Sequence, residues 1–569
     1  MQSETKICQN CKKDFIIEPD DFGFYEKIKV PPPTFCPECR FQRRMIFRNG
    51  RTLYRRQCDL CQKNIISIYS ADASFPVYCQ KCWWSDKWDP HKYAKDFDFS
   101  RPFFEQFKEL LFSVPAISIT NDNEMASINC EYTYDWFFSK NCYMSVSGWH
   151  AENVLYSYHI EHNKDMLDSM HMRECELSYE CLQCYKIARS QYCTYCSDCQ
   201  DCFLGYDLSG CLNCVMCIGL RNKSYCIKNK QYTKEEYEKE LEKMNLESYS
   251  SVEKYRKEFN RFCLDFPHKH AYIKKSVIST GDFLINCKNC KNAFMAINAE
   301  NLKFVFGGDT TKDSYDTTMT GKSELCYEGV VSDNSQRNYF SVFCFQCHDI
   351  WYSQYSPSAE FCFGCVGLKK GSYSIFNKRY PKEEYLKLRD EVIEHMKKTG
   401  EFGEFFPDWV SPFAYNESEV QEFFPLSKED IESKGHRWRE PDLRDYKVTL
   451  ELKQLPDNIK DTSDDILKEV IGCEHVRCNH NCTTAFRITF NELGLYRKLN
   501  IPLPHLCPNC RHFERIGRRN PPNLWHRSCM CDKENHEHKG KCVNEFETSY
   551  APDRPEIVYC EKCYQQEVY

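Results

Sequence analysis

The chain has 569 residues and a formal net charge of −7, so we expect about three to five domains, and not a protein that coats nucleic acid along its whole length. No apolar run approaches the roughly 20 residues that a membrane helix needs, and residues 1–10 lack the apolar core of a signal peptide. These features predict a soluble, cytoplasmic protein.

Cysteine is the most unusual feature of the composition. The chain has 39 cysteines, and most stand in C-x2-C pairs separated by polar residues or proline. Disulfide frameworks belong to small secreted domains, whereas paired cysteines in a cytoplasmic chain are typical of zinc sites. Because Zn²⁺ binds four thiolates tetrahedrally, we interpret the pairs as ligands of about six zinc ions.

The N-terminal module, residues 1–100, contains two such sets. They are Cys8, Cys11, Cys36 and Cys39, followed by Cys58, Cys61, Cys79 and Cys82. The loops between the pairs have lengths that are ordinary in zinc ribbons and treble clefs. Spacing does not decide whether neighbouring pairs combine sequentially or cross over, and we predict sequential pairing.

Two internal duplications organise the chain. The first relates its two ends, because residues 11–58 align with residues 482–529 at a constant offset. The second lies in the middle and aligns residues 134–241 with residues 282–389. The sequence therefore predicts a tandem pair of central copies between two related terminal modules.

The central copies, residues 128–245 and 276–393, are rich in Tyr, Phe, Ser and Cys. Their short runs are broken by Gly, Asn or Asp, which is typical of short β-strands. The retained pairs Glu152-Asn153 and Glu300-Asn301 indicate a turn that both copies need.

Both central copies keep one cysteine pattern, C-x2-C-x14-C-x2-C. Its members are Cys196, Cys199, Cys214 and Cys217 in the first copy, and Cys344, Cys347, Cys362 and Cys365 in the second. We assign zinc to both sets. An iron–sulfur cluster is disfavoured because the Cys-Pro of bacterial ferredoxins is missing. The alternative without metal is a β-solenoid whose stacked turns pack small cysteines inside.

A charged helix is predicted at the end of each central copy, starting after Thr233 and after Pro381. The following region, residues 394–472, carries proline and acidic clusters. We predict a linker there with a short helix at Ser463–Val470.

The C-terminal module, residues 473–569, repeats both terminal sets with changes. The predicted ligands are Cys478, Cys482, Cys507 and Cys510, and then Cys529, Cys542, Cys560 and Cys563. Cys473 stays open as the alternative to Cys478. An insertion in the second set adds Cys531, His536 and His538; we favour an exposed polar loop for the histidines, although one of them could replace a cysteine.

Both ends resemble the probable zinc-ribbon domain family of uncharacterised bacterial proteins. The N-terminal resemblance rests on Cys8-x2-Cys11, Phe15, Phe24-Tyr25, Pro33 and Cys36-Pro37-x-Cys39-Arg40. The C-terminal one rests on Cys482, Phe486, Leu495-Tyr496, Pro504 and Cys507-Pro508-x-Cys510-Arg511. The resemblance covers about 40 residues at each end and implies zinc binding, but no activity.

Arginines follow the first cysteine set of each terminal module, with aromatic residues between them. They are Arg40, Arg43, Arg44, Arg48, Arg51, Arg55 and Arg56, and then Arg511, Arg515, Arg518, Arg519 and Arg527. Arginine and aromatic side chains together bind phosphates and bases of single-stranded nucleic acid. The alternative is that these arginines brace the zinc sites and pair with nearby carboxylates.

We predict a mixed, β-rich protein with zinc-ribbon or treble-clef modules at both ends and a solenoid-like middle with short helices. Its predicted function is that of a non-catalytic, zinc-binding scaffold whose partner is nucleic acid or another protein. No signature of a phosphate-binding loop, metalloprotease, hydrolase or deaminase is present. A metal-dependent enzyme is therefore the least favoured class, and we assign no catalytic residue.

Overall fold

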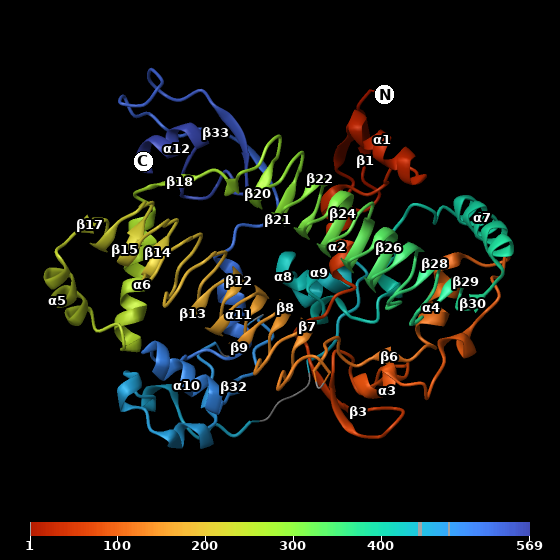
Figure 1. Cartoon of the computed structure of the whole chain (residues 1–569), viewed down its shortest axis with the longest axis horizontal. Helices are drawn as coiled ribbons and strands as arrows, with labels where there is room; N and C mark the ends of the chain where they lie inside the picture. Colours follow the sequence, from red (N-terminus) through yellow and green to blue (C-terminus); the bar gives the residue numbers. More distant parts are fainter. Residues whose placement is uncertain (1, 124, 442–445, 476–477, 479, 569) are drawn as a thin grey trace. The chain divides into compact units, whose positions relative to one another are not determined.

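The computed structural model describes residues 2–123, 125–441, 446–475, 478 and 480–568, and it divides into two compact units (Figure 1). Unit 1 comprises Met1–Ile119, Ile273–Arg439 and Pro522–Leu524, and unit 2 comprises Thr120–Tyr272, Glu440–Pro521 and Trp525–Tyr569. The N-terminal module thus belongs with the second central copy, and the C-terminal module belongs with the first.

The first central copy forms a stack of short parallel strands in unit 2, which we call β-stack 1. Its strands are β7 (Tyr134–Phe137), β8 (Val146–Trp149), β9 (Glu152–Leu155), β10 (Tyr158–Glu161), β11 (Lys164–Leu167), β12 (Met170–Arg173), β13 (Glu176–Tyr179), β14 (Phe203–Tyr206), β15 (Leu212–Ile218) and β16 (Ser224–Ile227). The antiparallel strand β17 (Lys230–Gln231) ends the stack. Two helices follow, α5 (Lys234–Met244), which Thr233 caps as predicted, and α6 (Tyr249–Cys263).

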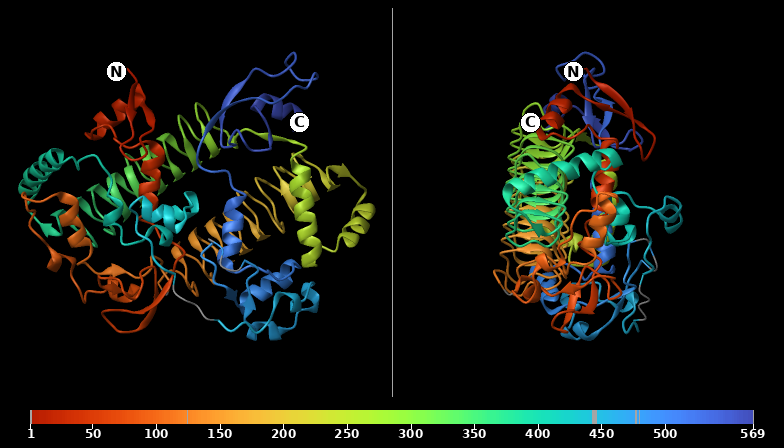
Figure 2. Two further views of the ribbon diagram at one scale, coloured as in Figure 1. Left: turned by 180° about the vertical axis from the view of Figure 1, so that it is seen from behind. Right: turned by 90° about the vertical axis from the view of Figure 1, so that its right-hand side faces the viewer.

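The second central copy forms the corresponding β-stack 2 in unit 1. Its strands are β19 (Ile273–Lys274), β20 (Gly281–Ile285), β21 (Ala293–Ile297), β22 (Glu300–Lys303), β23 (Phe306–Asp309), β24 (Lys312–Gly321), β25 (Tyr327–Asp333), β26 (Gln336–Phe345), β27 (His348–Trp351), β28 (Glu360–Phe363), β29 (Ser372–Ile375) and β30 (Lys378–Arg379). Helix α7 (Lys382–Thr399) begins after Pro381, as predicted. Figure 2 shows the strands of both stacks as successive rungs from behind.

Both stacks repeat every twelve residues. Tyr158 pairs with Met170 in β-stack 1, and Tyr327 pairs with Tyr339 in β-stack 2. In the central coils of both stacks, every third residue has a positive φ, and the residue after it is buried; Asn141 with Cys142 is one example, whereas the pattern weakens at the ends of the stacks, where Lys223 is exposed. The chain therefore turns inward once every three residues. This spacing places both cysteines of each C-x2-C pair of the stacks in the interior of the coils.

Small polar side chains line the inside of the coils because they satisfy the backbone at the turns. The hydroxyl of Ser157 donates to the carbonyl of Leu155 at 2.9 Å and accepts from the N–H of Ser169 at 3.1 Å. Cys181 takes the next place in this column, and its thiol donates to the carbonyls of Tyr179 and Ser190, both at 3.4 Å. Serine and cysteine fill the same role here, because each has one hydrogen to donate and an atom that can accept, although the thiol does both more weakly.

A ladder of side-chain amides joins neighbouring coils of each stack. In β-stack 1, Asn141 donates to Asn153 at 3.1 Å, and Asn153 donates to Asp165 at 2.7 Å. The same ladder in β-stack 2 joins Asn289, Asn301 and Asp313. Asn153 and Asn301 have φ values of 54° and 55°, a left-handed conformation that asparagine tolerates better than most residues. This accounts for the asparagine that both copies retain.

The N-terminal module in unit 1 consists of short hairpins and helices. Its elements are β1 (Glu4–Ile7), β2 (Asp14–Ile17), α1 (Pro19–Ile28), α2 (Pro37–Met45), β3 (Tyr54–Gln57), β4 (Asn64–Ser67), β5 (Val77–Tyr78), α3 (Gln80–Trp84) and the 3₁₀ helix η1 (Pro90–Tyr93). Helix α4 (Phe103–Leu111) and strand β6 (Ala116–Ile117) follow the module. Helix α2 packs against β24 and β25 of β-stack 2.

The C-terminal module in unit 2 repeats this plan. Its elements are β32 (Ala485–Phe486), α10 (Phe490–Leu499), α11 (Pro508–Gly517), β33 (Trp525–Ser528), β34 (Glu545–Thr548), β35 (Ile557–Tyr559) and α12 (Glu561–Val568). Strand β31 (Ile471–Gly472), just before the module, pairs with β32, and β35 pairs with β18 (Pro267–Lys269). Helix α10 packs against β11 and β13 of β-stack 1.

The predicted linker, residues 394–472, is divided between the units after Arg439. Its first part contains α8 (Val420–Phe423), α9 (Lys428–Ser433) and the 3₁₀ helices η2 (Asp408–Val410) and η3 (Tyr415–Glu417), and it buries Phe405 and Phe406 completely. Its second part contains η4 (Leu452–Gln454), η5 (Ile459–Asp461) and η6 (Asp464–Lys468). The helix predicted at Ser463–Val470 is therefore the 3₁₀ helix η6, capped by Ser463.

The predicted mixed, strand-rich fold with short helices and cysteine clusters at both ends is confirmed. None of the helices in the described ranges combines the length and the apolar character that crossing a membrane requires.

Candidate metal centres

The cysteines of the terminal modules gather in four tetrads. Site A is Cys8, Cys11, Cys36 and Cys39; site B is Cys58, Cys61, Cys79 and Cys82; site C is Cys473, Cys482, Cys507 and Cys510; site D is Cys529, Cys542, Cys560 and Cys563. Within each tetrad the four sulfur atoms lie within 4.8 Å of one another. Each tetrad therefore offers four thiols to one metal ion.

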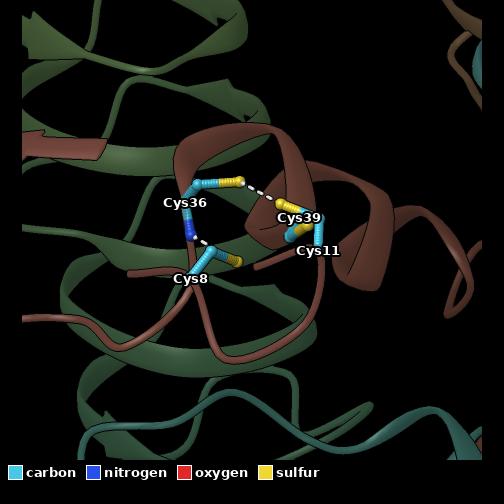
Figure 3. A group of neighbouring side chains, drawn as sticks. All are labelled: Cys8, Cys11, Cys36 and Cys39. Atoms are coloured by element: carbon cyan, nitrogen blue, oxygen red, sulfur yellow. Dashed lines mark hydrogen bonds between the residues drawn. The ribbon is translucent and has the colours of Figure 1, made fainter. Parts of the chain in front are cut away.

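A hairpin and a helix N-terminus build each tetrad. In site A, Cys8 and Cys11 lie in the turn between β1 and β2, whereas Cys36 caps α2 and Cys39 lies in its first turn (Figure 3). The N–H of Cys36 donates to Cys8 Sγ at 3.2 Å. The same bond, also at 3.2 Å, joins Cys79 to Cys58, Cys507 to Cys473, and Cys560 to Cys529. The four sites thus share one construction.

The sulfur spacing suits a tetrahedral ion. Sulfur–sulfur distances are 3.7 Å for Cys11–Cys36 and 3.9 Å for Cys61–Cys79. Four thiolates bound tetrahedrally at a Zn–S distance of about 2.3 Å lie about 3.8 Å from one another. The tetrads therefore have the dimensions of a four-thiolate zinc site.

Backbone N–H groups favour the thiolate form at one cysteine in each of sites A and B. Burial raises the pKa of Cys8, but the backbone N–H groups of Cys36, Cys11 and Asn10 outweigh it and lower this pKa to about 6. In site B the backbone N–H of Lys63 is the main cause that lowers the pKa of Cys61 to about 7. Thiolates, not thiols, are the ligands of zinc.

The structure brings together the predicted cysteines of sites A, B and D, but it changes one ligand in site C. Cys473 completes that tetrad, so the predicted Cys478 does not. Cys473 holds the position of Cys8, because its Sγ accepts from the N–H of Cys507. The sequence left Cys473 only as the alternative to Cys478, because eight residues separate Cys473 from Cys482, whereas two separate Cys8 from Cys11.

The insertion in site D is only partly an exposed loop. His538 is half-buried, whereas Cys531 and His536 are buried and lie in contact, with 3.1 Å between Cys531 Sγ and His536 Nδ1. The favoured interpretation as an exposed loop is therefore wrong for His536. Neither residue replaces a cysteine of the tetrad in site D.

The central cysteines have a role that requires no metal. Cys347 donates to the carbonyls of Phe345 and Ser356 at 3.3 and 3.0 Å, and Cys365 donates to those of Phe363 and Ser374 at 3.5 and 3.4 Å. Cys344, Cys362, Cys214 and Cys217 make the same pair of bonds, and Cys196 and Cys199 make the first of them. These thiols therefore hold the turns of the coils as the neighbouring serines do.

The contacts among the central thiols also differ from the predicted sets. Cys199 interacts with Cys202 and Cys211, and both of these also interact with Cys214. The structure thus groups cysteines of adjacent coils in β-stack 1, and the group includes two residues that β-stack 2 does not retain, because Ile350 and Ala359 stand in their places.

Replacing Cys347 and Cys365 by serine should leave the metal content of the chain unchanged. Serine makes the same turn bonds elsewhere in the stacks, so we expect unit 1 to lose no more than about 1.5 kcal/mol, the size of one hydrogen bond. Native mass spectrometry of the intact variant and chemical denaturation check both statements. Loss of a zinc ion would instead support the predicted central zinc site.

Most of the predicted nucleic-acid-binding arginines are buried. Seven are buried, namely Arg40, Arg44, Arg48, Arg56, Arg511, Arg515 and Arg519; Arg43, Arg51, Arg518 and Arg527 are half-buried, and Arg55 is exposed. A buried guanidinium cannot contact a phosphate in solution. The seven buried arginines therefore no longer support the prediction of a nucleic-acid partner.

Buried carboxylates of the stacks bind the arginines. In unit 1, Arg40 lies 2.9 Å from Asp316, and Arg44 lies 2.7 Å from Glu328. In unit 2, Arg511 and Arg515 lie 2.7 and 2.8 Å from Asp168, and Arg515 lies 2.9 Å from Glu180. Both units thus share a core of two arginines and two carboxylates, which Arg43 extends in unit 1 and Glu492 and Arg518 extend in unit 2.

Sequence reasoning missed these carboxylates, although a signal was available. Asp168 aligns with Asp316, and Glu180 aligns with Glu328, at the offset that relates the two central copies. Acidic residues retained at buried positions of a β-stack need partners of opposite charge. The arginines that both ends of the chain retain supply these partners, so the two sets of retained charges together could have predicted the ion pairs.

No protein-family model, curated protein or solved structure matches this chain. The resemblance to zinc-ribbon domains therefore rests on the terminal motifs and on the cysteine tetrads alone.

Proposed function

We propose that this chain is a zinc-stabilised scaffold protein that binds another protein and performs no catalysis. The observation that carries the proposal is that one helix in each unit completes a tetrad and also supplies the arginines that join the terminal module to its β-stack. Metal binding and the assembly of the unit are thus linked through one element.

The link in unit 1 runs through α2. Cys39, a ligand in site A, is followed directly by Arg40, and Arg44 lies one turn further along the same helix. A metal in site A would fix the first turn of α2, and the fixed helix would hold both guanidinium groups against Asp316 and Glu328. Because burying unpaired charges costs several kcal/mol, a helix that is held in place is needed to keep each charge with its partner.

Unit 2 repeats the link through α11. Cys510, a ligand in site C, precedes Arg511, and Arg515 follows one turn later. Its partners are Asp168 and Glu180 of β-stack 1. Two copies that diverged elsewhere have kept this arrangement, which supports a shared structural role for the metal.

Zinc is the metal that the tetrads favour. Four thiolates form a soft ligand set that suits zinc, and the hairpin with a helix N-terminus resembles the treble clef. Four protein ligands leave no open position for a water or a substrate, which catalytic zinc sites keep. The tetrads therefore support structural zinc in a reducing, cytoplasmic setting.

A protein partner is favoured over nucleic acid because the charged residues that would bind phosphates are engaged within the units. The repeated coils of the two stacks offer extended outer surfaces of the kind that repeat proteins use for binding. We therefore propose that the stacks carry the partner and that the terminal modules stabilise them.

Metal analysis of the intact chain tests the proposal. Protein purified under reducing conditions should hold zinc in each of the four tetrads, and a strong chelator should remove the near-UV circular dichroism together with the metal. Cobalt-substituted protein should show the spectrum of a four-thiolate site that does not change when azide is added. Iron with visible absorbance, or a spectrum that azide changes, would contradict structural zinc and favour an enzyme. Salt-sensitive co-purification of nucleic acid would contradict the choice of a protein partner.

A further inference from the structure

The insertion in site C places three more metal-binding side chains beside the tetrad. Eight residues lie between Cys473 and Cys482, and His475, Cys478 and His480 are among them. Together with Cys510 these three form a second group whose ligand atoms lie within 4.8 Å of one another. Cys510 belongs to both groups.

Contacts of the sulfur atoms place Cys510 between the two groups. Its Sγ lies 3.8 Å from Sγ of Cys473 on one side and 3.6 Å from Sγ of Cys478 on the other. Both distances match the edge of a thiolate tetrahedron around zinc, about 3.8 Å. The sulfur of Cys510 is therefore positioned to be a corner of two tetrahedra.

Helix α11 orients the two histidines. The ring of His480 stacks on Phe513 with 5.1 Å between centroids, and Nε2 of His475 lies 4.0 Å from a carboxylate oxygen of Glu514. The Nδ1 atoms of both histidines are buried, and neither has a hydrogen-bond partner among the described residues. A metal-binding histidine commonly points its other ring nitrogen at a carboxylate, and His475 does so.

Charge favours a second ion in this place. The two groups together contain five cysteines, which carry five negative charges as thiolates. One divalent ion would leave three of these charges uncompensated, whereas two ions would leave one. Because thiolates this close repel one another, the second ion removes most of that repulsion.

Site A shows what the same tetrad looks like without the insertion. Cys39 corresponds to Cys510, and its Sγ accepts a hydrogen bond from the side-chain amide of Asn10 at 3.3 Å. Gln42 and Arg43 stand where Phe513 and Glu514 stand in α11. The ligands and the groups that orient them thus occur together in site C and are both missing from site A.

We propose that Cys510 bridges two zinc ions. Cys473, Cys482, Cys507 and Cys510 bind the first ion, and His475, Cys478, His480 and Cys510 bind the second. The inference rests on the proposed function and deepens it, because it adds a two-metal centre to the C-terminal module.

Native mass spectrometry of the intact chain tests the second ion. The double variant His475→Ala/His480→Ala and the single variant Cys478→Ser should each hold one zinc ion fewer than the unchanged protein. The matched control is His150→Ala/His162→Ala, which removes two exposed histidines of β-stack 1 and should lose none. An unchanged zinc count in both test variants would overturn the proposal.

Cadmium NMR tests the bridge directly. In the unchanged protein, substituted with a spin-active cadmium isotope, two resonances should be split by cadmium–cadmium coupling through the shared sulfur, and the splitting should vanish in His475→Ala/His480→Ala. Unsplit resonances in the unchanged protein would overturn the bridge even if the variants lose two ions by unfolding. A site C that binds no metal at all would contradict the proposed function itself, whereas a single ion there would contradict only the bridge.

Discussion

Replacing Arg44 by methionine should destabilise unit 1 by roughly 3–5 kcal/mol, the usual cost of removing one partner of a buried ion pair. Arg44 is fully buried between Asp316 and Glu328, at 3.5 and 2.7 Å. Methionine fills much of the volume, so the loss is electrostatic. Asp316 keeps Arg40 at 2.9 Å and Glu328 keeps Arg43 at 3.3 Å, but the cation that joins these two buried carboxylates is gone. Hydrogen exchange or chemical denaturation of the intact chain measures the change in unit 1.

The control for this prediction is Arg55→Met. Arg55 belongs to the same basic run but is exposed, so its replacement should change stability by less than about 0.5 kcal/mol. Equal effects of the two substitutions would contradict the buried network. An intact unit that merely lost affinity for nucleic acid would restore the binding interpretation.

The cost of Arg44→Met should also depend on pH. Burial raises the pKa of Glu328, while Arg44 and Arg43 lower it, and the net direction is upward. Without Arg44 this pKa in the folded state rises further above its unfolded value, so the folded state binds the proton more tightly. The ionised carboxylate therefore costs stability at neutral pH, and the cost should shrink as the pH falls toward the raised pKa. We expect a smaller loss at about pH 6 than at about pH 7.5.

The equivalent substitution in unit 2, Arg515→Met, should cost less. Burial raises the pKa of Glu180, but Arg515, Arg518 and Arg256 outweigh it and hold this pKa below its ordinary value. Arg518 and Arg256 still lower the pKa of Glu180 after Arg515 is removed, whereas the pKa of Glu328 is raised even with Arg44, Arg43 and Arg40 all in place. Equal losses in both units would contradict this difference between the two carboxylates.

Replacing Cys39 by serine should remove the metal from site A and release α2 from β-stack 2. Structural zinc contributes roughly 10–16 kcal/mol of apparent binding free energy in small zinc-finger peptides, so its loss is as large as the whole stability of an ordinary domain. We expect one zinc ion fewer by native mass spectrometry and loss of hydrogen-exchange protection throughout α2. Sites C and D in unit 2 should keep their metal.

The control for Cys39→Ser is Cys344→Ser. Both cysteines are buried members of C-x2-C pairs, but Cys344 lies inside β-stack 2 and donates to backbone carbonyls. The Cys344→Ser variant should therefore keep all its zinc ions and the hydrogen-exchange protection of α2. Loss of protection in both variants would show that cysteine burial, not metal, holds the unit together.

The terminal sites were largely predictable because their ligands are local in sequence. A C-x2-C turn fixes two ligands by itself, and the constant offset between the two ends identified three cysteines of site C. The fourth, Cys473, lay outside the alignment because an insertion changed its spacing to Cys482 but not its hydrogen bond to Cys507. The number of residues between two cysteines gives only the length of the loop that joins them. Whether both bind one metal ion depends on where the folded chain places them.

The middle of the chain was harder because the same motif arises there from a different cause. Cys344-x2-Cys347 has the spacing of a zinc knuckle, but its cysteines face inward because each coil turns every three residues. The prediction that the arginines bind nucleic acid failed for a related reason. Arg40 and Arg44 form a basic surface only if nothing covers them, and their partners Asp316 and Glu328 lie about 280 residues away in the sequence.

Because the chain turns inward once every three residues, the position of a residue within this three-residue period decides whether its side chain is buried. In a flat β-sheet, a one-residue slip moves the buried side chains to the other face. In these stacks, an insertion or deletion of one or two residues would move every later cysteine and serine out of the interior until a compensating change restored the phase. Only insertions or deletions of a multiple of three residues would leave the same side chains buried. Only multiples of twelve would also keep the side-chain amides of the ladder, such as Asn289 and Asn301, opposite one another. The gap-free alignment of the two central copies is what such a constraint would preserve.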